Sequence, residues 1–204
     1  MSQNKQHWDN IYTDKSPLEV SWYQKEPLLS LSLIQECRIE KDNYIIDVGG
    51  GASHLVDYLL RDAYEHLIVL DISKKSLDIV RNRLASKAEK VLWLDSDITE
   101  FESSIQVDLW HDRAVFHFLT MPSDRQQYLQ VLNKTLRPGG FVIIAAFALG
   151  GPTQCSGLDI VQYDAEKLMA EFGTAYRLLD QKSETHMTPA NKQQQFTYYR
   201  LLKL

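Results

Sequence analysis

Short apolar runs alternate with helical patterns along the chain from residue 44 onward. Between these runs, apolar residues recur at three- and four-residue steps, which predicts amphipathic helices beginning near Ser53, Ser73 and Ser123. Strands that alternate with helices predict a parallel sheet with helices on both faces, because parallel neighbours need crossover connections. The runs that read as buried strands span residues 44–48, 66–71, 91–94, 107–111 and 141–146.

The end of the chain departs from this alternation. A further helix follows Asp164, and residues 176–180 and 196–204 then read as two strands joined by a polar loop that contains proline. Such a hairpin adds an antiparallel strand at the edge region of the sheet. The expected fold class is therefore α/β, with a mostly parallel sheet of seven strands between two helical layers.

Residues 1–40 read as a helical N-terminal segment that precedes the sheet, and residues 41–204 as its core. Amphipathic patterns cover 7–12 and 27–37, and the aromatic segment Ser21-Trp22-Tyr23-Gln24 separates them. We expect this segment to lie as a lid over the ligand-binding edge of the sheet. The whole chain is expected to form a single domain, since 204 residues match the usual size of one.

Composition and charge exclude several classes of protein. Hydrophobic residues make up 44% and charged residues 24%, as in an average globular protein. The formal net charge is −5 without a cluster of Lys and Arg, which argues against nucleic acid as a partner. Cys37 and Cys155 are far apart, so neither a disulfide framework nor a cysteine metal site is indicated, and a reducing cytoplasm fits. No secretion signal or membrane-spanning run is expected.

Four aspartates come at or just after the ends of the predicted strands: Asp47, Asp71, Asp97 and Asp112. Ligands of open parallel sheets bind outside the carboxyl ends of the strands, so these residues are candidate ligand contacts. Asp71 lies 20 residues beyond Gly51, where a carboxylate can accept hydrogen bonds from the hydroxyls of an adenosine ribose. This spacing indicates a nucleoside ligand.

The glycine-rich turn and the acidic rim favour a cofactor without phosphate. Gly49, Gly50 and Gly51 permit a sharp turn and a close approach of the backbone, but His54 stands where a pyrophosphate-binding loop has its third glycine. Carboxylates around a cleft also repel a pyrophosphate. S-adenosylmethionine carries a sulfonium and an ammonium group, and its single carboxylate suits the helix start near Ser53.

The ordered motifs resemble those of class I S-adenosylmethionine-dependent methyltransferases, a methyltransferase-domain family. These motifs are Asp47-Val48-Gly49-Gly50-Gly51, Asp71, Asp97-Ile98 and Leu136-Arg137-Pro138-Gly139-Gly140. The segment from His111 to Phe118 departs from the small or apolar residues that many members carry after the fourth strand, and it resembles a bacterial subgroup of unknown substrate. The resemblance covers residues 40–204, and Trp8-Asp9-Asn10-Ile11-Tyr12 and Ser21-Trp22-Tyr23 also resemble a methyltransferase lead-in. It implies a Rossmann-like three-layer sandwich and S-adenosyl-L-methionine as cofactor.

The resemblance also implies roles for individual residues. Asp47 and the three glycines would lie by the methionyl part of the cofactor, and Asp71 on its ribose. Ile72 would lie against the adenine face, and Asp97 with the Ile98 backbone N–H at the adenine edge, although Asp95 on the same turn is an alternative to Asp97. Asp112 and Trp22 complete the expected cofactor contacts; Trp22 either covers the cofactor or fills a gap beneath the N-terminal helix.

Methyl transfer needs a base only when the acceptor is protonated, and three residues are candidates: Asp112, His117 and His186. The sequence does not choose among them, and a packed histidine is the alternative for His117, which stands between Phe116 and Phe118. His111, Asp112 and His117 lack a further well-spaced ligand, so no metal is expected.

The expected activity is transfer of a methyl group to a small molecule or a protein side chain, by a monomer or homodimer. One alternative is a module that binds S-adenosylmethionine or S-adenosylhomocysteine without catalysis. A nicotinamide-dependent oxidoreductase is disfavoured by His54 and the acidic rim. A nucleic-acid methyltransferase is disfavoured because Asp112-Arg113-Ala114-Val115 stands where such enzymes carry an Asn-Pro-Pro-Tyr-like tetrapeptide.

Overall fold

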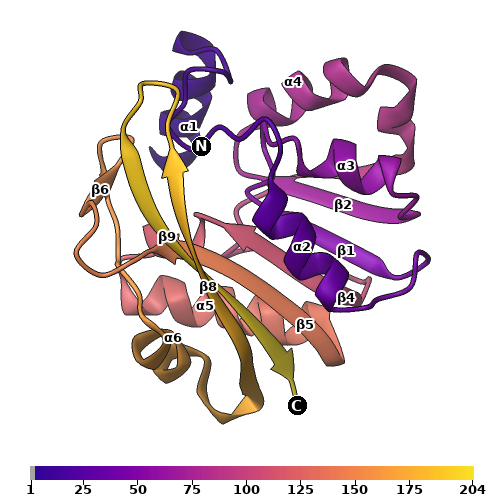
Figure 1. The fold of residues 1–204 in the computed structure, drawn as a ribbon. Helices are drawn as coiled ribbons and strands as arrows, with labels where there is room; N and C mark the ends of the chain where they lie inside the picture. The colour runs from indigo at the N-terminus through magenta and orange to yellow at the C-terminus, as the bar shows by residue number, and fades with distance from the viewer. Residues whose placement is uncertain (1–2) are drawn as a thin grey trace.

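The computed structural model describes residues 3–204. In this part of the chain a seven-stranded sheet has the order β3-β2-β1-β4-β5-β9-β8, and helices lie on both of its faces (Figure 1). A separate two-stranded ribbon, β6-β7, follows β5. The strands are β1 (Tyr44–Val48), β2 (His66–Asp71), β3 (Val91–Asp95), β4 (Val107–Arg113), β5 (Leu136–Phe147), β6 (Gln154–Cys155), β7 (Leu158–Asp159), β8 (Tyr176–Met187) and β9 (Gln193–Lys203).

The strand directions confirm the expected fold class. β3, β2, β1, β4 and β5 pair in parallel, whereas β9 is antiparallel to both of its neighbours, β5 and β8. Within the described sheet, β9 is therefore the one reversed strand, and it lies next to the edge strand β8 rather than at the edge itself. The sheet and its helices form the expected three-layer arrangement.

The helices divide between the two faces of the sheet. Those of the described chain with α-helical geometry are α1 (Gln3–Asp14), α2 (Leu28–Glu36), α3 (Leu55–Arg61), α4 (Lys74–Leu84), α5 (Pro122–Thr135) and α6 (Ala165–Phe172). Residues of α2, α3 and α4 share one buried cluster, and residues of α5 and α6 share the other. Helix α1 contributes to neither cluster and lies near the tips of the β8-β9 hairpin (Figure 1). None of these described helices is long and apolar enough to cross a membrane.

Two helix starts follow directly from local sequence. Ser73 caps α4 by accepting a hydrogen bond from the backbone N–H of Ser76, and Asp164 caps α6 by accepting one from Lys167. The third start differs slightly from expectation: α3 begins at Leu55 with His54 at the cap position, and the Ser53 hydroxyl accepts the Leu55 N–H at 3.0 Å.

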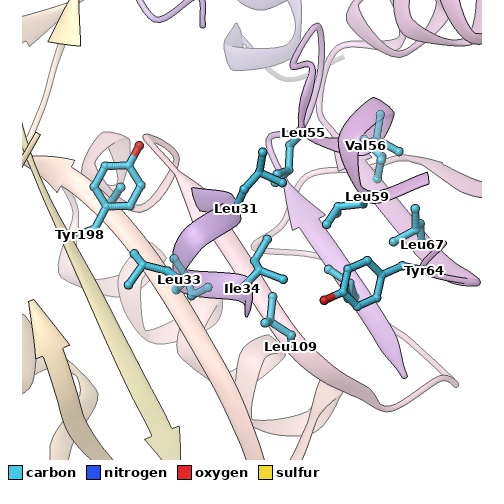
Figure 2. Packing of buried hydrophobic residues seen from close by; sticks show 14 of the residues in the cluster. Leu31, Leu33, Ile34, Leu55, Val56, Leu59, Tyr64, Leu67, Leu109 and Tyr198 are labelled. Atoms are coloured by element: carbon cyan, nitrogen blue, oxygen red, sulfur yellow. The ribbon is translucent and has the colours of Figure 1, made fainter. Parts of the chain in front are cut away.

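The first cluster of buried residues fixes the α2 and α3 layer on the sheet. Figure 2 shows Leu31, Leu33 and Ile34 of α2 packed beside Leu55 of α3 and Leu109 of β4. All of these side chains are at most 8% exposed. Burying them removes apolar surface from water, at about 25 cal/mol per Å², and this packing holds the glycine turn between β1 and α3 in place.

Four strand predictions were too short, and β5 starts at Leu136 instead of residue 141. β4 runs to Arg113, and the last hairpin extends β8 to Met187 and starts β9 at Gln193, in place of the expected polar loop. The polar segments of β8 and β9 pair with each other from Gln181↔Tyr199 to Met187↔Gln193. Backbone hydrogen bonds across a hairpin support strands without an apolar run, so a search for hydrophobic stretches misses them.

Candidate functional site

A cavity of about 360 Å³ opens at the carboxyl ends of β1, β2 and β4. This is the edge at which open parallel sheets bind ligands. The ends of β1 and β2 and the turn after β3 line one half, which we call the sheet-lined half. Helix α1, the segment around Trp22, the β6-β7 ribbon and residues of β5 and β9 line the other. Of the expected cofactor contacts, the cavity brings together Trp22, Gly49, Asp71, Ile72, Asp97 and Ile98.

Asp71, at the end of β2, is the buried carboxylate of the sheet-lined half. It is 7% exposed, and one of its oxygens accepts the backbone N–H of Ser73 at 2.8 Å. Burial raises the pKa of this carboxyl to about 7, partly opposed by hydrogen bonds from Ser73, Ser76 and the Gly51 backbone. A carboxylate in this position gains from a ligand that donates hydrogen bonds to it.

Gly51 is required for the placement of Asp71. Its φ is 21°, and a Cβ there would lie 2.5 Å from the second carboxylate oxygen of Asp71. Gly49 has φ 67°, and a Cβ there would lie 2.1 Å from a methyl carbon of Val115. The glycines therefore let the β1 turn close against the β2 and β4 turns.

Asp97, rather than Asp95, lines the cavity. The Asp97 carboxylate accepts hydrogen bonds from the backbone N–H and the hydroxyl of Thr99, at 3.0 and 2.7 Å, which fix the turn after β3. Asp95 forms an ion pair with Lys5 of α1 instead. Asp97 and Ile98 therefore line the cavity, and their contact with an adenine edge stays a prediction.

Asp47 does not line the main cavity but belongs to a buried polar chain beneath the glycine turn. One of its oxygens lies 2.7 Å from Nδ1 of His111, and Nε2 of His111 lies 2.9 Å from the Ser30 hydroxyl. These residues line a smaller pocket together with Gly50. The side chain of Asp47 faces α2, because it alternates with those of Ile46 and Val48, which face the α5 layer.

The expected carboxylate site at the start of α3 is largely engaged by the protein. The Ser53 N–H donates to Gly50, the Leu55 N–H donates to Ser53, and the Ala52 backbone lies in hydrogen-bond contact with the Tyr12 hydroxyl. The prediction of free donors near Ser53 is therefore not supported.

Asp112 is placed away from the cavity, contrary to its expected contact with cofactor or acceptor. Its carboxylate accepts the Tyr128 hydroxyl at 2.6 Å and the backbone N–H groups of Val115 and Phe116. The reason is the length of β4: Asp112 lies inside the strand, and its side chain points into the α5 layer while His111 points into the α2 layer. Burial raises the pKa of Asp112 to about 6.

Neither candidate histidine lines the cavity. His117 is fully buried against Phe118 and Phe147, both ring nitrogens lack a hydrogen-bond partner, and burial lowers its pKa to about 3. Nε2 of His186, on β8, lies 2.8 Å from the backbone carbonyl of Ser21, and burial lowers its pKa too. The three proposed bases therefore stay apart from the cavity and from each other. Among the described residues, no group of His, Cys, Asp and Glu is placed to hold a metal.

Several cavity residues escaped the sequence-based prediction. Arg113 follows directly after Asp112 at the end of β4 and lies in the cavity wall. Trp8 and Tyr12, in the predicted N-terminal helix, also line it, and so do Phe147, Gln194 and Phe196. The motif Trp8-Asp9-Asn10-Ile11-Tyr12 gave a signal for Trp8 and Tyr12. The sequence indicated β5 and β9 only as strands, without showing which of their side chains reach the cavity.

Comparison with known proteins places residues 46–142 in a family described as a methyltransferase domain. A relative, the ubiquinone/menaquinone biosynthesis C-methyltransferase UbiE of Coxiella burnetii, is 29% identical over 127 residues. This match covers 56% of the present chain, and the chain spans about half (47%) of the length of that relative.

Two solved structures show how widely the fold matches. The S-adenosylmethionine-dependent methyltransferase of Anabaena variabilis superposes with a TM-score of 0.78 at 15% identity, covering 98% of this chain and 93% of its own. The N-methyltransferase NodS of Bradyrhizobium japonicum, solved with S-adenosyl-L-homocysteine, gives 0.72 at 14% identity, with 99% of each chain covered. At these identities the superpositions establish a shared fold.

Proposed function

Because the chain belongs to the class I S-adenosylmethionine-dependent methyltransferases, we propose that it binds S-adenosyl-L-methionine in the main cavity and transfers the methyl group to an acceptor beside it. The NodS structure in complex with S-adenosyl-L-homocysteine supports this choice of cofactor for the fold. A nicotinamide cofactor is disfavoured, since the loop after β1 lacks a third glycine at His54 and four carboxylates line the cavity, those of Asp71, Asp97, Asp124 and Asp159.

One observation carries the proposal: the buried carboxylate of Asp71 lines the cavity at the end of β2, directly followed by Ile72. A carboxylate in this place can accept both hydroxyl hydrogens of a ribose, while Ile72 and Ile98 offer apolar contacts to an adenine ring. This half of the cavity therefore fits the nucleoside part of the cofactor, with a carboxylate that accepts hydrogen bonds and apolar side chains beside it.

The protein's own part in the reaction is to bind and orient. The sulfonium of the cofactor supplies an activated methyl carbon, so transfer proceeds by displacement in line with the breaking carbon–sulfur bond. Holding an acceptor at this carbon provides an effective molarity of about 10⁵ M or more. The aromatic side chains of Trp8, Trp22 and Phe118 cover the cavity from the side of α1 and keep water from the reacting atoms.

The cavity favours a small molecule as acceptor over a protein side chain. Its wall includes α1, the Trp22 segment and the β6-β7 ribbon, so an acceptor has to fit between these elements. We further propose a cytoplasmic enzyme, monomeric or homodimeric, in agreement with the free thiols of Cys37 and Cys155.

A transfer assay with methyl-labelled S-adenosylmethionine tests the activity. The protein is incubated with the label and with the small-molecule and macromolecular fractions of a cell extract, in parallel. We expect label in a small-molecule product and none with Asp71→Ala. Label in the protein fraction alone would favour a side-chain acceptor. Tight binding of S-adenosylhomocysteine without any labelled product would instead support a binding module without catalysis.

A further inference from the structure

Aromatic rings make up much of the cavity wall, and all of them except Tyr12, whose hydroxyl lies by Ala52 and Asp71, form what we call the aromatic half. Six of them come from five separate parts of the chain, namely α1, the segment before α2, the turn after β4, β5 and β9. The six residues are Trp8, Tyr12, Trp22, Phe118, Phe147 and Phe196.

These rings support one another through direct contacts. Trp8 meets Trp22 and Phe118 edge to face, with ring centroids 5.7 and 5.1 Å apart, and Phe147 meets Phe196 at 4.6 Å. The buried ring of His117 joins the two groups, since it contacts both Phe118 and Phe147. The aromatic wall is therefore preformed, which lowers the entropic cost of binding a rigid, flat ligand.

Arg113 closes the aromatic wall with a positive charge. Its guanidinium lies over the ring of Phe196, 4.6 Å from the centroid, and its side chain is 10% exposed. It donates to the Tyr198 hydroxyl at 2.8 Å and to the Trp22 carbonyl at 3.0 Å, and reaches Glu184 at 3.5 Å. A guanidinium has five N–H donors, so these contacts leave donors for a ligand. Among the described residues that line the cavity, Arg113 is the one with a basic side chain.

Gln194, at the start of β9, adds an unpaired acceptor to the same wall. Its side-chain carbonyl oxygen is buried without a hydrogen-bond partner, and the residue lines the cavity. A buried polar atom without a hydrogen-bond partner destabilises the free protein, so its presence in a cavity wall points to a ligand that bonds to it. The matching ligand group is a hydroxyl or a ring N–H.

From these observations we propose that the methyl acceptor is a planar hydroxyaromatic or hydroxy-heteroaromatic molecule, held between the aromatic rings and bound through its oxygen by Arg113. This inference rests on the proposed methyltransferase function and specifies its substrate class. Gln194 accepts a hydrogen bond from a second polar group on the same ring.

The chemistry balances without a protein base. The acceptor loses its acidic proton to water, and the guanidinium of Arg113 favours the resulting anion by charge. A bond then forms between the nucleophilic oxygen or ring atom and the methyl carbon, while the carbon–sulfur bond breaks and its electrons remain on sulfur. The products are the methylated acceptor and the neutral thioether S-adenosylhomocysteine. This agrees with the placement of Asp112, His117 and His186 outside the cavity.

A cationic amine is the competing kind of acceptor, since aromatic walls also bind ammonium groups. Arg113 opposes it by like charge. Besides Asp71 and Asp97, the carboxylates of Asp124 and Asp159 line the cavity. The charged group that contacts the aromatic rings is nevertheless Arg113, which lies over Phe196 and forms an ion pair with Glu184 at 3.5 Å. We therefore assign the aromatic half to a neutral or anionic ring.

The test uses the full-length protein loaded with S-adenosylhomocysteine and three probes: 4-nitrophenol, cyclohexanol and benzyltrimethylammonium. The phenol and phenolate forms of 4-nitrophenol differ in visible absorbance, so binding and ionisation are read separately. We expect 4-nitrophenol to bind at least about tenfold more tightly than either other probe, and to titrate at lower pH when bound than in buffer.

Variants separate the charge of Arg113 from its packing. Arg113→Met should abolish the shift in the titration of bound 4-nitrophenol and weaken its binding about tenfold or more, whereas Arg113→Lys, which keeps the charge, should retain part of the shift. Gln194→Leu should weaken binding without moving the titration. The control Arg177→Met alters an exposed residue of β8 and should change neither.

The outcomes distinguish this inference from the function on which it rests. If S-adenosylhomocysteine binds but 4-nitrophenol binds no better than cyclohexanol, or if benzyltrimethylammonium binds best, the assigned acceptor class is wrong and the methyltransferase function stands. An unshifted titration with wild-type protein would remove Arg113 from the site. Failure to bind S-adenosylhomocysteine would overturn both the proposed methyltransferase function and the acceptor class inferred from it.

Discussion

At the scale of single residues, Asp71 is placed so that it favours ligand binding but lowers the stability of the free protein. Its carboxyl is buried, which raises its pKa to about 7, yet the proposed contact with ribose hydroxyls needs the ionised form. The free protein therefore bears a cost that a bound nucleoside relieves. Such a residue is selected for binding at the expense of stability.

We expect the affinity for S-adenosylhomocysteine to rise with pH between about 6 and 8 and then to level off, as Asp71 ionises near its pKa of about 7. Asp71→Asn should weaken binding by about 1–3 kcal/mol above neutral pH and flatten this dependence. Titration calorimetry at a series of pH values checks the effect. An equally steep pH dependence in the variant would assign it to another group.

Asp71→Asn should weaken ligand binding but increase the stability of the free protein. Because the folded pKa of Asp71 lies above the ordinary value of 3.8, the free fold binds more protons than the unfolded chain between these values, and its stability falls as pH rises through them. Without ligand, Asp71→Asn should therefore raise the urea midpoint at pH 8 more than at pH 4. A lower midpoint at pH 8 would contradict the desolvation cost assigned here.

Asp112 has a structural role, which Tyr128→Phe tests. The Tyr128 hydroxyl donates to Asp112 at 2.6 Å and accepts the Trp110 indole N–H at 2.8 Å, and all three residues are fully buried. Removing this hydroxyl leaves the buried Asp112 carboxylate and the Trp110 indole N–H each without one hydrogen bond. We therefore expect the free energy of unfolding to fall by about 1–3 kcal/mol. Tyr58→Phe, whose hydroxyl makes an exposed 3.4 Å contact, should cost less than about 0.5 kcal/mol.

At the level of elements, helix α1 is attached to the cavity rather than to the core. The Ser73 hydroxyl donates a hydrogen bond to the Asp9 carboxylate at 2.7 Å, and Lys5 forms an ion pair with Asp95. The ring of Trp8 contacts those of Trp22 and Phe118. None of the residues of α1 belongs to the two buried clusters. It therefore has the properties of a lid whose position depends on what lies beneath it.

Trp8→Ala should free this lid with little effect on the rest of the fold. We expect faster hydrogen exchange in residues 3–14, weaker binding of S-adenosylhomocysteine, and a change below about 1 kcal/mol in the free energy of unfolding. Gln6→Ala changes an exposed residue of the same helix and serves as the control. If both variants exchange alike, Trp8 does not anchor α1.

The elements were predictable where apolar periodicity is strong. The strands β1 and β2, the apolar part of β5 and the helix capped by Ser73 lie close to their predicted places, because burial on both sheet faces leaves continuous apolar runs. The polar halves of β8 and β9 were missed, since hairpin hydrogen bonds leave no apolar signature. The two-residue extension of β4 changed the site most, because it moved Asp112 into the α5 layer and brought Arg113 to the cavity.

For the molecule as a whole, the strand order explains why a cavity forms where it does. In the sheet, β1 lies between β2 and β4, so the turns after these three strands meet at one edge. The sequence predicted the cofactor half, whose residues follow the strands directly. The aromatic half was predicted only in part: the N-terminal segment with Trp8 and Trp22 was expected over this edge, whereas Phe147 and Phe196 reach it only through long-range packing.

The central claim is that this edge of the sheet binds a cationic nucleoside cofactor through Asp71. Titration calorimetry of the wild-type protein and Asp71→Ala with S-adenosylhomocysteine and with NAD tests it most directly. The account predicts that S-adenosylhomocysteine binds the wild type more tightly than NAD does, and that Asp71→Ala loses about 1–3 kcal/mol of this affinity. Tighter binding of NAD, or an unchanged dissociation constant in Asp71→Ala, would contradict it.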